Sequence, residues 1–134
     1  MMKIGNVNLQ GRAVLAPMAG VTDRAFREVC AGFGASYVVS EMVSSKGLQY
    51  NDKHTSRLME LGDAERPVGI QLFGDDPAVL AFAAKKAMAY HPDVIDINMG
   101  CPVRCTLMNI SCGKRSSSFL ILSKVTTGLS AVSV

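Results

Sequence analysis

The sequence predicts an α/β fold, the N-terminal half of an eight-stranded (β/α)8 barrel that stops after about four strands. Short apolar runs recur with helical segments between them, which is the pattern of βαβ units and of a parallel sheet. The runs are apolar along most of their length, as strands buried on both faces should be. The chain has 134 residues, whereas a complete barrel takes ~250.

The first predicted strand covers residues 13–18 and ends in a loop at Ala19-Gly20. A helix over residues 23–33 should follow, because the side-chain oxygen of Thr22 or Asp23 can accept a hydrogen bond from a free backbone N–H at its start. Glycines 32 and 34 end this helix. Its apolar residues fall on one face, and they are Phe26, Val29, Cys30 and Phe33.

Three further strands are expected at residues 37–42, 67–73 and 94–99. A polar excursion with helical turns covers residues 44–61. The helix between the last two strands runs from Asp76 to about Tyr90 and has Pro77 in its first turn, where proline is tolerated best. Its inward face should consist of Val79, Leu80, Ala83, Ala87 and Met88.

Several classes of protein are disfavoured by what the sequence lacks. No Gly-x-Gly-x-x-Gly follows the first strand and no phosphate-binding Gly-x-x-x-x-Gly-Lys-Ser/Thr occurs, so a barrel is favoured over the open nucleotide-binding sheets. The apolar runs are far shorter than the ~20 residues that a membrane helix needs. The N-terminus lacks the apolar core of a secretory signal, so we expect a cytoplasmic protein with free cysteines.

The two parts of the chain differ in charge and pattern. Residues 1–96 contain 10 Lys/Arg and 11 Asp/Glu, whereas residues 97–134 contain 4 Lys/Arg and no acidic residue. After Pro102 the alternation of apolar runs and helical segments stops and serine becomes frequent. We therefore expect a partial barrel over residues 1–103 and an atypical tail, without a regular element, over residues 104–134.

Candidate functional residues follow the predicted strands, since function in parallel α/β folds gathers at the carboxyl ends of the strands. A backbone turn there can approach a flat ring, a side-chain amide can donate and accept hydrogen bonds, and a thiol can transfer a proton. Each candidate also has a structural interpretation, as a satisfied polar residue, a loop cap or a small buried side chain. The candidates are Pro17, Met18, Ala19, Gln71, Asn98 and Cys101.

A metal site built from cysteines is the competing interpretation of the segment around Cys101. Cys101, Cys105 and Cys112 form a C-x3-C-x6-C series, and thiolates bind zinc and iron–sulfur clusters. The spacing matches neither a zinc knuckle nor the common cluster motifs, and the two histidines, at positions 54 and 91, are not close in sequence. We expect no metal.

Four segments in order along the chain carry a family resemblance. They read Ala-Pro-Met-Ala-Gly-Val-Thr-Asp at residues 16–23, Ser-Glu-Met-Val at 40–43, Gly-Ile-Gln-Leu-Phe-Gly at 69–74 and Asp-Ile-Asn-Met-Gly-Cys-Pro at 96–102. Together they resemble the tRNA-dihydrouridine synthases, and the start of the chain is most similar to the bacterial B-type branch. The resemblance covers roughly residues 3–103.

The resemblance implies a TIM-type barrel that binds FMN and reduces uridine in tRNA to 5,6-dihydrouridine, with NADPH as the source of the hydride. It places the backbone of Pro17, Met18 and Ala19 along the flavin. Gln71 would form a hydrogen bond with the flavin ring and Asn98 would lie against the flavin or the uracil. Cys101 would donate the proton to C5 of the base, for which a neutral thiol is suited at neutral pH.

The resemblance weakens after Pro102. In the family, the Cys-Pro pair is followed by Lys-Val and a glycine-rich stretch, and both are missing here from residue 103 onward. Residues 104–134 look as though they were read in a shifted frame. We therefore expect a truncated and inactive chain. Two alternatives stay open. One is a fragment of another FMN-dependent barrel oxidoreductase, such as a dihydroorotate-type dehydrogenase, although the Met-Gly-Cys-Pro segment at residues 99–102 argues against it. The other is a noncatalytic fragment that self-associates through an open sheet edge.

Overall fold

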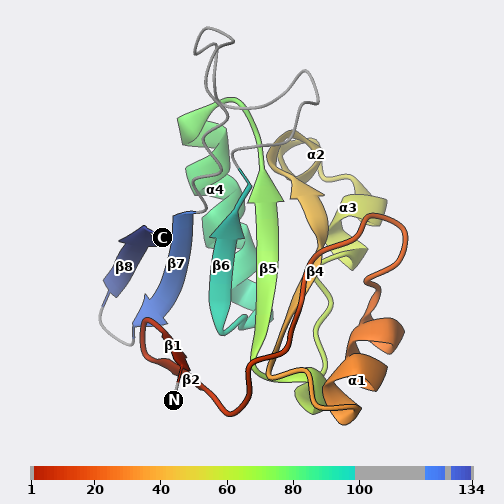
Figure 1. Ribbon diagram of the computed structural model, residues 1–134. Helices are drawn as coiled ribbons and strands as arrows, with labels where there is room; N and C mark the ends of the chain where they lie inside the picture. Colours follow the sequence, from red (N-terminus) through yellow and green to blue (C-terminus); the bar gives the residue numbers. More distant parts are fainter. Residues whose placement is uncertain (1, 99–119, 126–127, 134) are drawn as a thin grey trace, which may run out of the picture.

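A six-stranded mixed sheet forms the centre of the computed structural model, which describes residues 2–98, 120–125 and 128–133. The first four strands are parallel neighbours in chain order, as Figure 1 shows. They are β3 (Val14–Leu15), β4 (Tyr37–Ser44), β5 (Val68–Phe73) and β6 (Val94–Ile97). The predicted fold class is confirmed: within the described residues the parallel strands make a partial barrel and not a closed one.

Helices follow the parallel strands and are capped by the polar residues that precede them. The α-helices are α1 (Arg24–Gly32), α2 (Ser45–Gln49), α3 (Lys53–Arg57) and α4 (Pro77–Ala87). Two short 3-10 helices, η1 (Asp63–Glu65) and η2 (Met88–Tyr90), complete the connections. The N-cap side chains that accept backbone hydrogen bonds are Asp23, Ser44, Asp52 and Asp76. Among the described helices, none is long and apolar enough to cross a bilayer.

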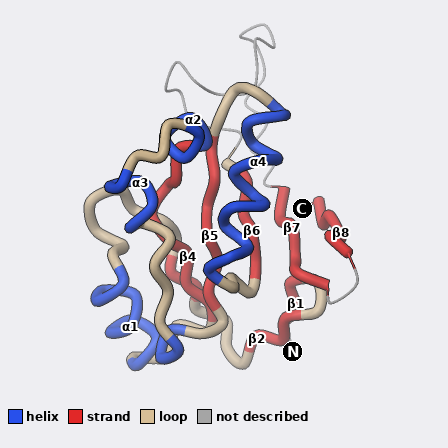
Figure 2. Tube along the Cα trace, turned by 180° about the vertical axis from the view of Figure 1, so that it is seen from behind, coloured by secondary structure: helices blue, strands red, loops and turns tan. Residues whose placement is uncertain are grey.

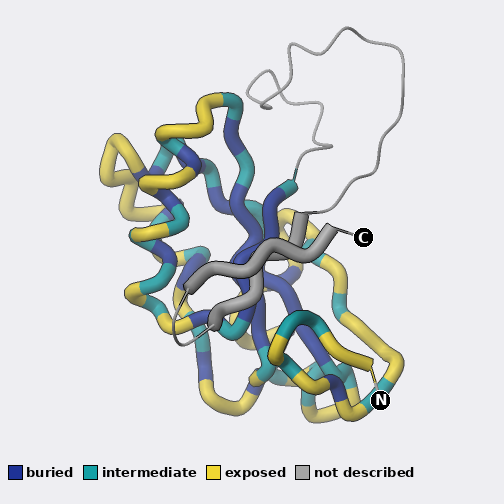
Figure 3. The backbone as a smooth tube through the Cα atoms, turned by 90° about the vertical axis from the view of Figure 1, so that its left-hand side faces the viewer, coloured by how far each residue is buried: buried dark blue, intermediate teal, exposed yellow. Residues whose placement is uncertain are grey.

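The main core lies between the sheet and the helices that follow β4 and β5. Figure 2 shows α4 packed across β5 and β6, and Figure 3 shows that the central strands are the most buried part of the chain. Three of the five predicted inward positions of α4, Leu80, Ala83 and Ala87, are buried there. From the strands, Val43, Ile70, Leu72, Ile95 and Ile97 join the same cluster.

A β-hairpin that the sequence analysis does not anticipate covers part of the opposite face of the sheet. It consists of β1 (Met2–Ile4) and β2 (Val7–Leu9), with Gly5 at φ 54° in the turn. Its Leu9 packs against residues at the amino-terminal ends of the parallel strands, namely Tyr37, Val39 and Val94. We call this face the inner face of the sheet. The hairpin covers it near the amino-terminal ends of the parallel strands and not near their carboxyl-terminal ends.

Helix α1 forms where it is expected, but its apolar face is not buried. Phe26, Val29 and Phe33 are 38%, 55% and 91% exposed, and Arg27 is the buried residue of the helix. The helix packs on β4 and η1 beside the two-residue edge strand β3. Its apolar face is therefore largely exposed within the described part of the chain.

Two antiparallel strands extend the sheet where no regular element is expected from the sequence. They are β7 (Leu120–Val125), which pairs with β6, and β8 (Gly128–Ser133), which pairs with β7. The expectation of a tail without a regular element is wrong for these residues. Apolar and β-branched residues suit a strand, and the outer edge of β6 offers unpaired backbone groups. The division into domains at residue 103 stays a prediction.

Candidate functional site

Three strand ends bring polar side chains together on the inner face of the sheet. Asn98, just after β6, donates from Nδ2 to Oε1 of Gln71 at 3.2 Å and contacts Sδ of Met42 at 3.1 Å. Gln71 is 1% exposed, and its Nε2 donates to Oδ2 of Asp96. The predicted candidates Gln71 and Asn98 therefore do meet, at the carboxyl ends of β5 and β6.

The alternation of side chains along β5 explains why Gln71 points inward. Its neighbours Ile70 and Leu72 belong to the core beneath the helices, so the residue between them faces the other side. In the ladder Met42 lies opposite Gln71, and Gln71 lies opposite Asp96. The three residues thus form a row across three strands.

A β-bulge in β4 sets the direction of the side chains beside this row. The register of β4 and β5 shifts between Val39 and Met42. There the Ser40 hydroxyl accepts a hydrogen bond from the backbone N–H of Gln71 at 3.2 Å and donates to the carbonyl of Glu41 at 2.9 Å. Bulges re-aim side chains at functional rims, and here Glu41 and Met42, adjacent in sequence, contact two different parts of the site.

Asp96 is a buried carboxylate without a cationic partner among the described residues. Its Oδ2 accepts from Gln71, whereas Oδ1 has no hydrogen-bond partner there. Burial raises the pKa of this carboxyl above its ordinary value, although the hydrogen bond from Gln71 opposes the shift. The Tyr37 hydroxyl is likewise buried without a partner, and burial, with Asp96 adding to the effect, raises its pKa.

The predicted turn at Pro17, Met18 and Ala19 follows β3 and is tied to its own backbone. The buried Thr22 accepts from the Met18 N–H at 3.0 Å and donates to the Met18 carbonyl at 3.1 Å. The backbone N–H groups of Val21 and Thr22 also donate to that carbonyl, each at 3.0 Å. The Gly20 N–H, at a residue with φ 74°, donates to the Glu41 carboxylate.

Strand β4 therefore links the two halves of the site. Glu41 holds the turn, and the next residue, Met42, contacts Asn98. The turn itself stays accessible, since the Met18 side chain is exposed. This arrangement combines an accessible, hydrogen-bonded backbone turn with two side-chain amides, of which Gln71 is buried and hydrogen-bonded to both of its neighbours.

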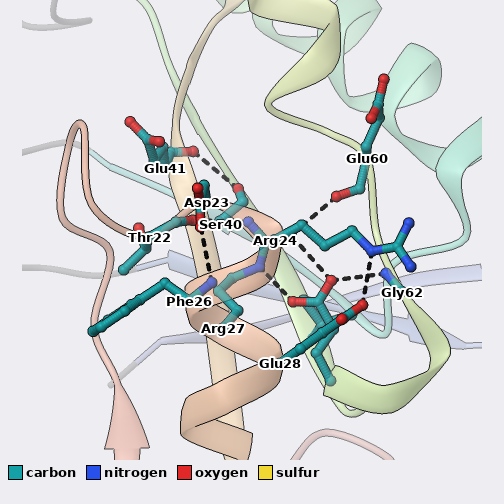
Figure 4. A network of polar contacts seen from close by, with 12 residues as sticks. Thr22, Asp23, Arg24, Phe26, Arg27, Glu28, Ser40, Glu41, Glu60 and Gly62 are labelled. Atoms are coloured by element: carbon teal, nitrogen blue, oxygen red, sulfur yellow. Dashed lines mark hydrogen bonds and ion pairs between the residues drawn. The ribbon is translucent and has the colours of Figure 1, made fainter.

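A buried ion pair between Arg27 and Glu65 lies next to the turn, and Figure 4 shows Arg27 among its neighbours Thr22 and Glu60. Arg27 and Glu65 are 2% and 1% exposed, and both guanidinium nitrogens Nε and Nη2 contact the carboxylate. Arg27 also donates from Nη1 to the Thr22 carbonyl at 2.8 Å and from Nη2 to the Glu60 carbonyl at 2.9 Å. Glu65 accepts from the Gly62 N–H at 2.8 Å.

A cleft of about 370 Å³ lies beside the start of α1. Thr22, Asp23 and Glu41 line it on one side, and His54 and Arg57 of α3 on the other. Its size is within the range of small-molecule sites, roughly 300–1,000 Å³. Both signs of charge are present in its walls, so it does not select an anion or a cation by charge alone.

Cys101 lies outside the described residues, as do Cys105 and Cys112 of the alternative metal site. Within the described part of the chain, no three His, Cys, Asp or Glu residues gather as a metal site would require. Neither the Arg27–Glu65 pair nor Asp96 is among the site residues predicted from the sequence. A charged residue within an apolar strand run marks Asp96, but no local signal pairs residues 27 and 65.

The fold and the site define a partial (β/α) barrel with a polar rim at the carboxyl ends of its parallel strands. The family model described as dihydrouridine synthase matches residues 14–110, and the chain belongs to this family. The match extends past residue 103, where the resemblance was expected to end.

Curated relatives agree with this assignment. The chain is 45% identical over 121 residues to tRNA-dihydrouridine synthase B of Pseudomonas aeruginosa, covering 90% of this chain and 35% of the relative. It is 44% identical over 104 residues to the Vibrio vulnificus protein of the same name, covering 77% and 32%. For the Pseudomonas putida protein the identity is 42% over 121 residues, covering 90% and 34%. The chain spans about a third of the length of these relatives.

Proposed function

We propose that this chain belongs to an enzyme that reduces uridine in tRNA to 5,6-dihydrouridine, and that the carboxyl ends of its parallel strands form part of the flavin site. The observation that carries the proposal is the meeting of Gln71 and Asn98 beside the fixed turn, in a chain of the dihydrouridine synthase family. FMN is the cofactor that the family resemblance implies, and NADPH is the reductant. Localisation in the cytoplasm, where tRNA is modified in bacteria, belongs to the same proposal.

The residues at the rim fit a flavin. The isoalloxazine ring has carbonyl oxygens and ring nitrogens that need donors and acceptors, and a side-chain amide such as that of Gln71 supplies both. Gln71 Nε2 is already directed to Asp96 and its Oε1 to Asn98, so the amide is held in one orientation. When bound, the reduced flavin supplies the hydride for C6 of uracil.

The chain's own residues have separate tasks in this proposal. The backbone at Pro17, Met18 and Ala19 would lie along the ring, while Gln71 would form a hydrogen bond to its edge. Asn98 would orient the flavin or the uracil. Cys101 would donate the proton from Sγ to C5 of the base, which gains electron density as C6 is reduced.

A chimera tests this function, because the chain spans a third of its relatives. Residues 1–103 replace the matched segment of the Pseudomonas aeruginosa protein, and dihydrouridine is measured in tRNA from a strain without its own synthases. We expect dihydrouridine to be restored. Absence of dihydrouridine from a chimera that folds and binds flavin would contradict the proposal.

The role of Gln71 is tested with a matched pair of substitutions in that chimera. Gln71→Met keeps the side-chain volume but removes the amide, and Gln10→Met does the same at an exposed position. Flavin retention should weaken about fivefold or more in the first variant, as for a net hydrogen bond of ~1 kcal/mol. Equal retention by both variants would remove Gln71 from the flavin site.

A second candidate function, self-association of the chain, is favoured by the exposed apolar residues of α1. Phe26 and Val29 of α1 and Phe33 at its C-cap are exposed, and β3 is the edge strand of the sheet. A second copy would cover this face and the free edge. We expect Phe33→Ser to lower the weight-average mass in sedimentation, whereas Ala81→Ser on the exposed side of α4 should not. A chain that is monomeric at all concentrations would contradict this candidate.

A further inference from the structure

We propose that Arg27 and Glu65 form a positioning pair, which holds the turn at residues 17–22 in the conformation that faces the flavin. The identity of the ligand rests on the proposed function. That the ion pair fixes the conformation of the turn concerns this chain alone. Neither residue would touch the cofactor. They act through Thr22, whose carbonyl accepts from Arg27 and whose hydroxyl holds Met18.

The geometry of the pair favours a positioning role. Arg27 uses three nitrogens for four contacts, two to the Glu65 carboxylate and one each to the carbonyls of Thr22 and Glu60. A guanidinium is rigid and planar, so fixing it on Glu65 also fixes the direction of the bond to Thr22. The contacts join a turn after β3 to the segment before β5, which are distant in sequence.

The burial of the pair makes the contacts obligatory. Arg27 and Glu65 are almost inaccessible to water, and removal of either partner would leave an unpaired buried charge. By contrast, the Arg24–Glu28 pair one turn earlier on the same helix is exposed, with side chains 54% and 32% accessible. Exposed pairs of this kind contribute little to stability, so Arg24 provides a matched control.

Further hydrogen bonds tie the turn both to a side chain outside it and to its own backbone. Gly20 donates to Glu41 of β4, and the backbone N–H groups of Val21 and Thr22 close on Met18. Four amides of the turn, at residues 18, 20, 21 and 22, are thus hydrogen-bonded although the surrounding side chains are largely exposed. Their hydrogen exchange reports on local opening of the turn.

The experiment measures residue-resolved amide hydrogen exchange in the 134-residue chain and in three variants. Arg27→Lys keeps the charge but loses the planar fork, Glu65→Gln keeps the shape but loses the charge, and Arg24→Lys is the control. We expect exchange at residues 18–22 to become at least about tenfold faster in both Arg27→Lys and Glu65→Gln and to stay unchanged in the control. The amides of β5 should exchange at the wild-type rate.

Two results would overturn the positioning role. One is unchanged exchange of the turn in a folded Arg27→Lys protein. The other is equal acceleration in the turn and in β5, or global unfolding of both ion-pair variants, because the pair would then stabilise the whole sheet and not the turn. These measurements contain no flavin. The result for the ion pair is therefore independent of whether the proposed cofactor binds.

Discussion

Gln71 donates a hydrogen bond from Nε2 to Oδ2 of Asp96 and accepts one at Oε1 from Asn98. The two bonds distinguish the two ends of the amide, because a carboxylate accepts and the Asn98 Nδ2 group donates. The orientation of Gln71 is therefore set by a buried acid that begins the segment at residues 96–102 but is not among the predicted site residues. The first prediction concerns that acid.

Asp96→Asn should stabilise the chain at neutral pH. Burial raises the pKa of Asp96 above 3.8 in the folded state, so the folded protein binds more protons than the unfolded one between 3.8 and the raised value. Stability therefore falls as pH rises through this window, and the loss persists above it. Urea unfolding across pH 4–8 should show this decline in the wild type and a flatter profile in Asp96→Asn. The same slope in both proteins would contradict the prediction, with the fully exposed Asp63→Asn as control.

Gly69→Ala should destabilise the sheet through a clash with Tyr37. A Cβ at residue 69 would lie 2.1 Å from the Tyr37 hydroxyl oxygen, in a part of the sheet where the ring has little freedom. Overpacking of this kind costs about 1–3 kcal/mol. Tyr37→Phe removes the unpartnered hydroxyl and should be neutral or stabilising. In a double-mutant cycle the cost of Gly69→Ala should be smaller in the Tyr37→Phe background, and additive effects would rule out the clash.

The purified 134-residue chain should not retain FMN. In barrels of this type the phosphate group of the ligand is bound by loops after the seventh and eighth strands, and the described residues supply four parallel strands. The measurement is the visible absorbance of the protein after desalting, with the chimera as the positive control. Stoichiometric flavin on the unextended chain would show that this rim binds the cofactor without those loops.

Cys101→Ala in the chimera should impair formation of dihydrouridine while leaving flavin binding and flavin reduction by NADPH nearly intact. The thiol is needed only once the hydride has been transferred to the base, and loss of a positioned general acid costs ~10²–10⁴ in rate. Single-turnover kinetics with tRNA separate the two steps. Cys30→Ala changes a free cysteine on α1 and serves as control. Unchanged turnover in Cys101→Ala would exclude it as the proton donor.

Limited trypsin digestion should cut the chain first at Lys114 or Arg115. Residues 104–119, before β7, contain no acidic residue and include three consecutive serines at 116–118, a composition that offers little apolar surface to offset the entropy of ordering. Arg57, in comparison, lies in helix α3, whose first turn is capped by Asp52. Mass spectrometry identifies the first products. Early cleavage at Arg57 with an intact Lys114-Arg115 site would show that the boundary near residue 103 is wrong.

The parallel sheet and the meeting of Gln71 with Asn98 could be predicted from the sequence, because both follow from local patterns. Apolar runs define parallel strands, and the carboxyl ends of such strands share one rim, so residues that end different runs must come close together. The hairpin could have been predicted in the same way. Its Gly5-Asn6 pair, between alternating apolar and polar residues, is a recognised turn signal.

The Arg27–Glu65 pair could not be predicted, because it depends on tertiary structure. The spacing of apolar residues indicates which side of α1 is apolar, but it does not indicate which side meets the sheet. The side that does so carries Arg27, which is buried because Glu65 and two backbone carbonyls satisfy its donors. The strands β7 and β8 depend in the same way on the free edge of β6.

The antiparallel pairing of β7 with β6 has a consequence for any longer chain with this sequence at its start. Residues 94–97 of β6 offer one outer row of backbone donors and acceptors, and β7 now uses it. A fifth parallel strand, as barrel closure requires, would need the same row. Closure is therefore an exchange reaction, in which an incoming strand must displace a resident one of opposite direction, and the relative affinity of the two for β6 decides whether the sheet remains open.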